Sequence, residues 1–290
     1  MPGLFASPFT FARRELSLKD ARYAVLGIPY DGSESYRPGS RFAPNAIREA
    51  SREIEDYDMQ EEFDLRKLGI SDCGDVDVSF GNYQETSRRV RVSIEGILEQ
   101  DAVPICLGGE HTISHAVVGA YPEKPFFLVF DAHLDFRKEY LDERFSHACL
   151  IRRIGELIGY ENILAIGVRS AAEEELKDAE KLGLKFIDFR GCEDIPRLIG
   201  LIADEIRGRD VYMSLDMDVF DPREAAGVCN PEPGGFSYWD FVTCMDFLKK
   251  AKIVGFDIVE VTPLYDSYTP VLVAKLIFKI LTKMEMASGE

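Results

Sequence analysis

The stretch FFLVFDAHLD, residues 126–135, places three polar side chains at alternate positions directly after five apolar residues. A short and uniformly apolar run is typical of a parallel strand that helices cover on both faces. If the extended conformation continues, Asp131, His133 and Asp135 point to the same side. Buried carboxylates are costly unless they are paired or bind a metal. The stretch therefore predicts a central strand that carries a metal site at its carboxyl end.

Apolar strands alternate with helical stretches along the rest of the chain. The expected strands are Arg22–Ile28, Val103–Leu107, Pro125–Phe130, Asn162–Val168, Leu184–Ile187, Asp210–Leu215 and Ile253–Val259. The expected helices are Pro44–Arg52, Thr86–Glu99, Thr112–Ala120, His147–Ile158, Ala171–Leu182, Cys192–Arg207, Ser237–Lys250 and Pro270–Met286. This alternation predicts a three-layer α/β fold, with a doubly wound, mainly parallel sheet between helices. Without a repeat or a linker, residues 1–290 are expected to form a single catalytic domain.

Composition restricts the class of partner. The chain has 51 acidic and 34 basic residues, a formal net charge of −17. This balance argues against nucleic acid, whose phosphates need a basic surface. It is compatible with a cationic substrate, although an acidic surface also serves ordinary solubility. No apolar run suits a membrane span, and the N-terminus does not resemble a signal peptide. We therefore expect a cytoplasmic protein with its six cysteines reduced.

Two further clusters follow predicted strands in the same way. LGGEH, residues 107–111, ends in His111, and SLDMDVFDP, residues 214–222, holds Asp216 and Asp218 two positions apart. Ligands of an open parallel sheet bind at the carboxyl ends of its strands. Asp221, which precedes a proline, is expected to cap a turn. His115, one helical turn after His111, is expected to pack or cap rather than to bind metal.

The three clusters supply two imidazoles and four carboxylates, from His111, Asp131, His133, Asp135, Asp216 and Asp218. Six protein ligands are too many for one catalytic ion but suit two ions that share bridging carboxylates. Two divalent cations would balance the charge of the four aspartates. Oxygen and imidazole ligands without thiolate favour Mn²⁺, with other divalent ions possible. Such a pair lowers the pKa of a shared water and makes it a nucleophile. Cys149 is therefore not expected to act as a nucleophile.

These clusters, in this order, resemble the ureohydrolases, the family of arginase and agmatinase. GIPYDG at 27–32 and RPGSRFAPNAIR at 37–48 are similar to the family's N-terminal strand and loop. DIVEVTP at 257–263 resembles its final active-site strand. The resemblance covers nearly the whole chain and implies an arginase-like fold. It also implies homo-oligomers, either trimers or hexamers.

The resemblance assigns roles by position. His111 and Asp135 would bind the first Mn²⁺, and His133 and Asp218 the second. Asp131 and Asp216 would bridge the two ions. Glu260 would pair with the substrate guanidinium, and His147 would shuttle protons to the leaving amine. The implied reaction is hydrolysis of a guanidino compound to urea and an amine.

Within this family, agmatinase is favoured, with agmatine hydrolysed to putrescine and urea. The loop 136–147 lacks the hydroxyl and amide residues that arginase uses for its substrate's carboxylate. Arg137 leaves an alternative open, because it could receive a carboxylate of guanidinobutyrate or formiminoglutamate. A structural ion pair of Arg137 with Glu139 or Asp142 is the other interpretation. A non-catalytic metal-binding relative and a one-zinc enzyme acting on acetylated amines are the alternatives from other classes.

Overall fold

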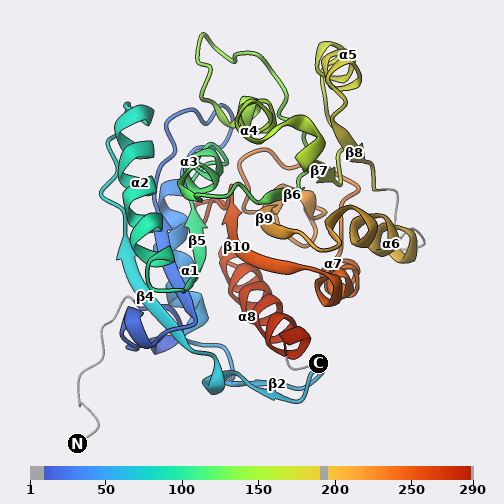
Figure 1. Cartoon of the computed structure of the whole chain (residues 1–290). Helices are drawn as coiled ribbons and strands as arrows, with labels where there is room; N and C mark the ends of the chain where they lie inside the picture. Colours follow the sequence, from blue (N-terminus) through green and yellow to red (C-terminus); the bar gives the residue numbers. More distant parts are fainter. Residues whose placement is uncertain (1–9, 190–194, 289–290) are drawn as a thin grey trace, which may run out of the picture.

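An eight-stranded sheet forms the centre of the computed structural model, which describes residues 10–189 and 195–288 (Figure 1). Its strands are β1 (Tyr23–Ile28), β4 (Ile70–Asp75), β5 (Val103–Gly108), β6 (Phe126–Phe130), β7 (Ile163–Ile166), β8 (Lys185–Ile187), β9 (Asp210–Asp216) and β10 (Lys252–Val259). They are ordered β4-β1-β5-β10-β9-β6-β7-β8, and all neighbouring pairs are parallel. A two-stranded antiparallel sheet joins β2 (Tyr57–Asp58) to β3 (Phe63–Asp64).

Helices cover both faces of the sheet, which confirms the predicted three layers. They are α1 (Ala43–Ser51), α2 (Tyr83–Leu98), α3 (Ile113–Ala120), α4 (Leu150–Ile158), α5 (Glu173–Leu182), α6 (Ile195–Ile206), α7 (Tyr238–Cys244) and α8 (Thr269–Ser288). Helices α1, α6, α7 and α8 contribute to one hydrophobic core, and α2, α3, α4 and α5 to the other.

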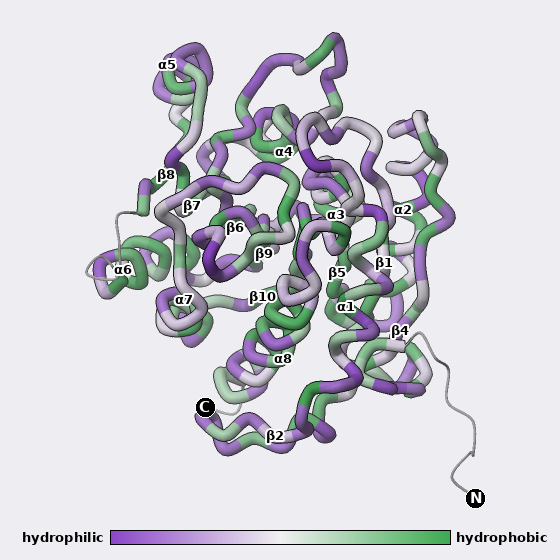
Figure 2. The backbone as a smooth tube through the Cα atoms, turned by 180° about the vertical axis from the view of Figure 1, so that it is seen from behind, coloured by the Kyte–Doolittle hydropathy of each residue, from purple (hydrophilic) through white to green (hydrophobic). Residues whose placement is uncertain are grey.

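Successive residues of the central strands enter opposite cores. In β1, Tyr23 and Val25 belong to one core, whereas Ala24 and Leu26 belong to the other. This follows from the two-residue period of a strand, whose side chains point alternately to the two faces. Figure 2 shows hydrophobic and hydrophilic colours along α8, whose buried residues Leu272, Leu276 and Ile280 belong to the same core as α1.

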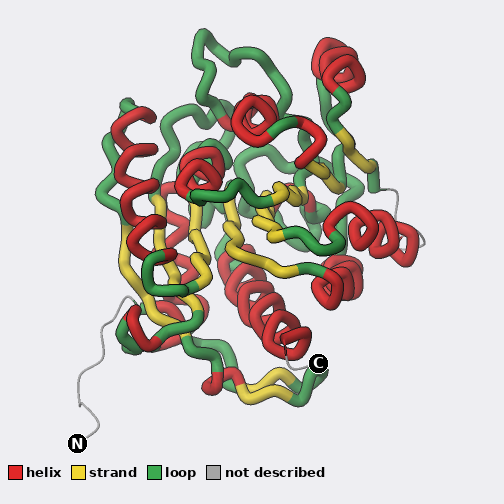
Figure 3. Tube along the Cα trace, in the orientation of Figure 1, coloured by secondary structure: helices red, strands yellow, loops and turns green. Residues whose placement is uncertain are grey.

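The predicted site residues lie at the carboxyl ends of four strands that are consecutive in the sheet. β5, β10, β9 and β6 are consecutive in the strand order, and each leads at its carboxyl end into a segment with candidate site residues. Long loops lie beyond several of these ends, including the segment between β6 and α4 (Figure 3). Parallel pairing therefore brings residues far apart in sequence to one edge of the sheet.

Several sequence-based expectations need correction. The strand β4 was not predicted, because its sequence ISDCGD is polar and only its first two residues are buried. The predicted helix 237–250 divides into α7 and a 3-10 helix, Met245–Lys250. Helix α6 begins at Ile195, and the predicted start at Cys192 lies outside the described residues.

Cys73, Cys106, Cys149, Cys229 and Cys244 are all free thiols. Within residues 10–189 and 195–288, no helix combines the length and the apolar character that a membrane crossing needs.

Candidate metal centre and active site

Two imidazoles lie on either side of one buried carboxylate. Asp131 Oδ2 is 3.1 Å from His111 Nδ1, and Asp131 Oδ1 is 3.7 Å from His133 Nδ1. Asp135 and Asp216 approach His111 Nδ1 at 3.7 and 3.2 Å. The structure thus gathers the residues predicted for the first ion around His111.

The residues predicted for the second ion lie around His133. Asp218 Oδ2 is 2.8 Å from His133 Nδ1, and the other oxygen of Asp218 accepts the backbone N–H of Ala132 at 3.0 Å. Two groups of potential ligands occur, and within each group the ligand atoms lie within 4.8 Å of one another: His111, Asp131 and Asp135 in the first, and Asp131, His133 and Asp218 in the second. Asp131 belongs to both groups. Asp131 thus has the position expected of a bridging ligand. Asp216 contacts His111 through one oxygen, and its other oxygen accepts the N–H of Asp218 at 2.9 Å.

The electrostatics of this cluster fit cations. Burial, followed by the charge of neighbouring aspartates, raises the pKa of Asp131, Asp135 and Asp216. His111 Nδ1 and Asp131 Oδ2 are buried without a hydrogen-bond partner of acceptable geometry. Such atoms are costly inside a protein unless something compensates them. Two divalent cations would do so, since the donors are oxygens and imidazole nitrogens suited to Mn²⁺.

Local backbone geometry places these side chains. A Cβ on Gly109 would lie 2.0 Å from the carbonyl oxygen of Tyr30, so only glycine fits in the GGEH turn. Asp135 and Glu260 adopt positive φ angles of 45° and 64°. This region is uncommon for residues other than glycine, and such strain is concentrated at functional sites.

A hydrogen-bond chain behind His111 had no role in the sequence interpretation. His111 Nε2 lies 2.9 Å from Ser214 Oγ, which donates to Asp257 Oδ1 at 2.6 Å. Tyr212 donates to the other oxygen of Asp257 at 2.7 Å. Ring nitrogens opposite a metal are held by partners of this kind, which orient the ligand. Ser214 and Asp257 lie on β9 and β10, so their adjacency depends on strand pairing.

Glu260 lies beside the metal cluster. Its Oε1 accepts the backbone N–H of His111 at 2.6 Å, while its Oε2 is buried and has no hydrogen-bond partner. Burial, followed by the charge of Glu34, raises the pKa of Glu260 to about 8. The free oxygen suits a cationic donor such as a guanidinium.

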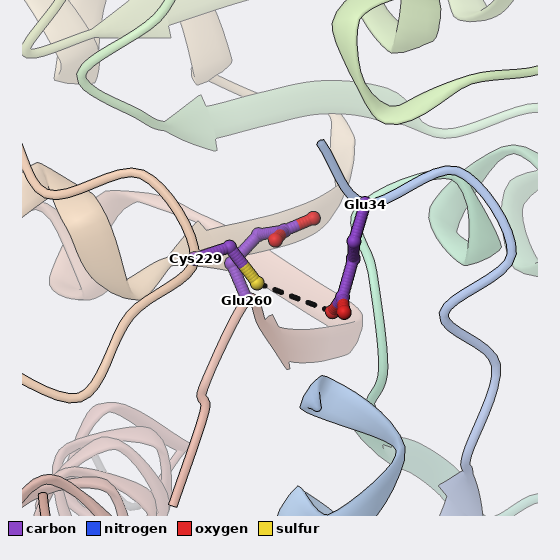
Figure 4. A group of neighbouring side chains, drawn as sticks. All are labelled: Glu34, Cys229 and Glu260. Atoms are coloured by element: carbon purple, nitrogen blue, oxygen red, sulfur yellow. Dashed lines mark hydrogen bonds between the residues drawn. The ribbon is translucent and has the colours of Figure 1, made fainter. Parts of the chain in front are cut away.

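Glu34 and Cys229 adjoin Glu260 and were missed from the sequence (Figure 4). The Cys229 thiol donates to Glu34 Oε1 at 3.2 Å, and Glu34 also accepts the backbone N–H groups of Gly39 and Ser40. Burial, followed by the charges of Glu260 and Glu34, raises the pKa of Cys229, which keeps the thiol protonated as a donor. This contact ties the loop 30–41 to Cys229, whose backbone N–H donates to the carbonyl oxygen of Glu260 at 3.1 Å.

A cavity of about 310 Å³ opens onto the cluster. Its lining includes Asp135, Arg137, Tyr140, His147, Glu175 and Glu260. His147 is 8% exposed, and burial, followed by the charges of His133 and His111, lowers its pKa to about 4. The His147 ring is therefore neutral near pH 7 and able to accept a proton.

Arg137 forms an ion pair that differs from the two predicted ones. Its Nε lies 3.7 Å from Glu175 Oε2, so the expectation of Glu139 or Asp142 is wrong. Glu175 belongs to α5, a different element, and it already accepts the backbone N–H groups of Phe136 and Ala172. Folding brings this buried acid nearer than the acids of the Arg137 loop.

The residues predicted to have structural roles have such contacts. His115 Nδ1 lies 2.9 Å from the Tyr83 hydroxyl. Asp221 accepts the backbone N–H groups of Arg223 and Gly234 at 3.0 and 2.9 Å, as a turn cap does. Burial raises the pKa of Cys149 to about 11, which disfavours a thiolate nucleophile.

Comparison with known proteins agrees with this geometry. The model of the arginase family matches residues 21–282. An agmatinase of Pyrococcus horikoshii is 36% identical over 273 residues, covering 92% of this chain and 93% of the relative. The N(1)-aminopropylagmatine ureohydrolase of Thermococcus kodakarensis is 39% identical, covering 89% of both chains. The agmatine ureohydrolase structure of Thermoplasma volcanium superposes with a TM-score of 0.89 at 34% identity, covering 99% of this chain and 97% of that one. The chain described here therefore belongs to the arginase family.

Proposed function

We propose that this protein hydrolyses a guanidino compound to urea and an amine, with agmatine as the preferred substrate. The site would hold two divalent cations, Mn²⁺ first among them. The observation that carries the proposal is the pairing of a buried cluster of candidate metal ligands with the unpartnered Oε2 of Glu260. One feature suits the activation of water, and the other suits the capture of a guanidinium beside it.

The bound cations would lower the pKa of a shared water and so supply a nucleophile near neutral pH. Glu260 would accept two N–H groups of the planar guanidinium and hold its carbon toward the aspartates. Hydrolysis breaks one C–N bond of the guanidine, so the departing nitrogen needs a proton. His147, which lines the same cavity, would carry that proton.

A cationic tail is favoured over an anionic one. The Arg137 guanidinium is already paired with Glu175, which reduces its availability for a substrate carboxylate. The net charge of −17 also favours cations near the cleft. A longer polyamine tail is a second candidate, since the Thermococcus relative is named for N(1)-aminopropylagmatine. Guanidinobutyrate, formiminoglutamate and arginine are the alternatives with a carboxylate.

The proposal also includes a cytoplasmic location and a homo-oligomer. Free thiols at the described cysteines suit a reducing compartment. Light scattering on purified protein would test the oligomer, and a monomeric mass would contradict it.

Urea release tests the proposed activity directly. Purified protein is loaded with Mn²⁺, its metal content is counted, and agmatine, aminopropylagmatine, guanidinobutyrate and arginine are assayed. We expect two ions per chain and the highest kcat/KM with a cationic-tailed substrate. Uptake of at most one ion, together with no urea from any guanidine, would overturn the proposal. Two bound ions without turnover would support the non-catalytic alternative.

A further inference from the structure

The loop at 30–41 and the GGEH segment meet at the ring of His147. Ser33 Oγ lies 3.1 Å from His147 Nδ1, and the backbone N–H of His147 donates to the same Oγ at 3.0 Å. Ser33 Oγ also donates to Glu110 Oε1 at 2.9 Å, and the Ser33 N–H donates to Glu110 Oε2 at 2.6 Å. One hydroxyl therefore connects a buried carboxylate to the candidate proton carrier.

Glu110 is built to receive hydrogen bonds. Its side chain is fully buried, and Thr112 Oγ1 adds a third donor at 2.6 Å. The backbone N–H among these donors cannot reverse its direction. That N–H holds Oε2 as an acceptor, while Oε1 accepts the Ser33 and Thr112 hydroxyls, so the Ser33 hydroxyl proton lies between Ser33 Oγ and Glu110 Oε1.

The count of protons then decides the form of His147. A serine hydroxyl has one proton and two acceptor lone pairs. With its proton directed to Glu110, Ser33 Oγ accepts the His147 backbone N–H with one lone pair. The remaining lone pair faces His147 Nδ1 at 3.1 Å. That contact is favourable only if Nδ1 carries a proton, because two lone pairs would otherwise repel each other.

We propose that Ser33 and Glu110 are positioning residues that hold neutral His147 in its Nδ1–H form and leave Nε2 as the basic nitrogen. The inference rests on the role proposed for His147 in proton transfer. The ring of Tyr140 packs edge-on against the His147 ring, with centroids 5.7 Å apart, and restrains it from another side. The same logic governs other catalytic histidines, in which a partner on one nitrogen selects the nitrogen that reacts.

Ser33→Ala tests whether Ser33 positions the His147 ring, and the two readouts are kcat and the tautomer of His147. We expect kcat to fall about tenfold, which is part of the roughly 10²- to 10⁴-fold that a positioned acid–base group contributes. KM and metal content should stay unchanged, because Ser33 is not among the candidate metal ligands or the residues proposed to bind the guanidinium. Ser33→Thr restores the hydroxyl and should restore kcat. Ser40→Ala, a matched serine in the same loop that donates to Glu34 through its backbone, should match the wild type.

Histidine ¹⁵N NMR supplies a readout that does not depend on turnover. The chain has four histidines, and His147→Ala identifies the signal of interest in protein loaded with diamagnetic Zn²⁺. We expect Nδ1–H in the wild type and a shift of the population toward Nε2–H in Ser33→Ala. A wild-type Nε2–H form, or an unchanged kcat in Ser33→Ala, would overturn the proposal that Ser33 and Glu110 position His147. If no guanidine yields urea, the proposed function fails, whereas the NMR result still decides this inference.

Discussion

The backbone N–H of His111 donates to Glu260 Oε1 at 2.6 Å, across 149 positions of sequence. This hydrogen bond joins a candidate metal ligand to the candidate guanidinium partner through the main chain. It orients Glu260 without using Oε2, which stays buried and free. The distance between the candidate metal ligand His111 and the candidate guanidinium partner Glu260 is thus set by two neighbouring strands, β5 and β10.

Glu260→Gln should reduce kcat/KM by roughly 10- to 100-fold while both metal ions remain bound. A hydrogen bond to a charged group contributes about 1.5–3 kcal/mol, and each 1.36 kcal/mol corresponds to about tenfold. The amide oxygen of Gln can still accept the His111 N–H, so the metal site keeps its geometry. Steady-state kinetics with parallel metal analysis would check this, and loss of metal from the variant would contradict it.

The metal-free protein should show a pH effect that depends on Glu260. The pKa of Glu260 is raised to about 8 in the folded chain, from an ordinary value of 4.5, because the carboxyl is buried and faces Glu34. Between these values the folded state keeps a proton that the unfolded state releases. Rising pH therefore removes stability across this window. Without metal, the Tm of Glu260→Gln minus that of the wild type should increase from pH 5 to pH 8. A constant difference would disagree.

Asp131→Ala should abolish urea release and weaken the binding of both ions, since Asp131 adjoins His111 and His133. Saturating Mn²⁺ stabilises a protein that binds it by about 4 kcal/mol at a thousandfold excess over Kd. The variant should lose most of that gain in Tm. Asp221→Ala is the control, because this aspartate caps a turn and should leave two ions per chain. Retention of both ions by Asp131→Ala would argue against a bridging role.

Ser214→Ala should weaken metal binding without removing any proposed ligand. It deletes the hydroxyl that connects His111 Nε2 to Asp257. Loss of such a partner costs roughly 10- to 100-fold in metal affinity or activity. A competition titration with a metal chelator would measure the change, and His115→Gln, which alters a histidine bonded to Tyr83, serves as the comparison. An unchanged metal affinity in Ser214→Ala would show that the hydrogen bonds through Ser214 and Asp257 do not support His111.

Arg137→Gln should change substrate preference rather than abolish turnover. The substitution removes a cation from the cavity lining and leaves the negative charge of Glu175. The ratio of kcat/KM for agmatine to that for guanidinobutyrate should rise several-fold, because the cavity becomes more negative. A fall in this ratio would indicate that Arg137 serves a cationic tail in some other way.

The amino-acid sequence alone predicts the layered α/β architecture and the six candidate metal ligands. Apolar runs such as 126–130 predict buried strands, and polar residues directly after them must lie at the carboxyl edge of a parallel sheet. The local chain settles these features, since a strand and the residues that follow it are contiguous. The polar edge strand β4 was not predicted from the sequence. Its own strand pattern is weak, and pairing with β1 stabilises it.

Folding alone decided which distant residues support the site. Ser33 reaches His147 across 114 positions, Ser214 reaches His111 across 103, and Glu34 reaches Cys229 across 195. Arg137 likewise forms an ion pair with Glu175 on α5 and not with an acid in its own loop. These contacts depend on strand order and loop paths, and a hydrogen bond requires placement to within a few tenths of an ångström. No local pattern encodes that placement, because it arises from the packing of the whole sheet.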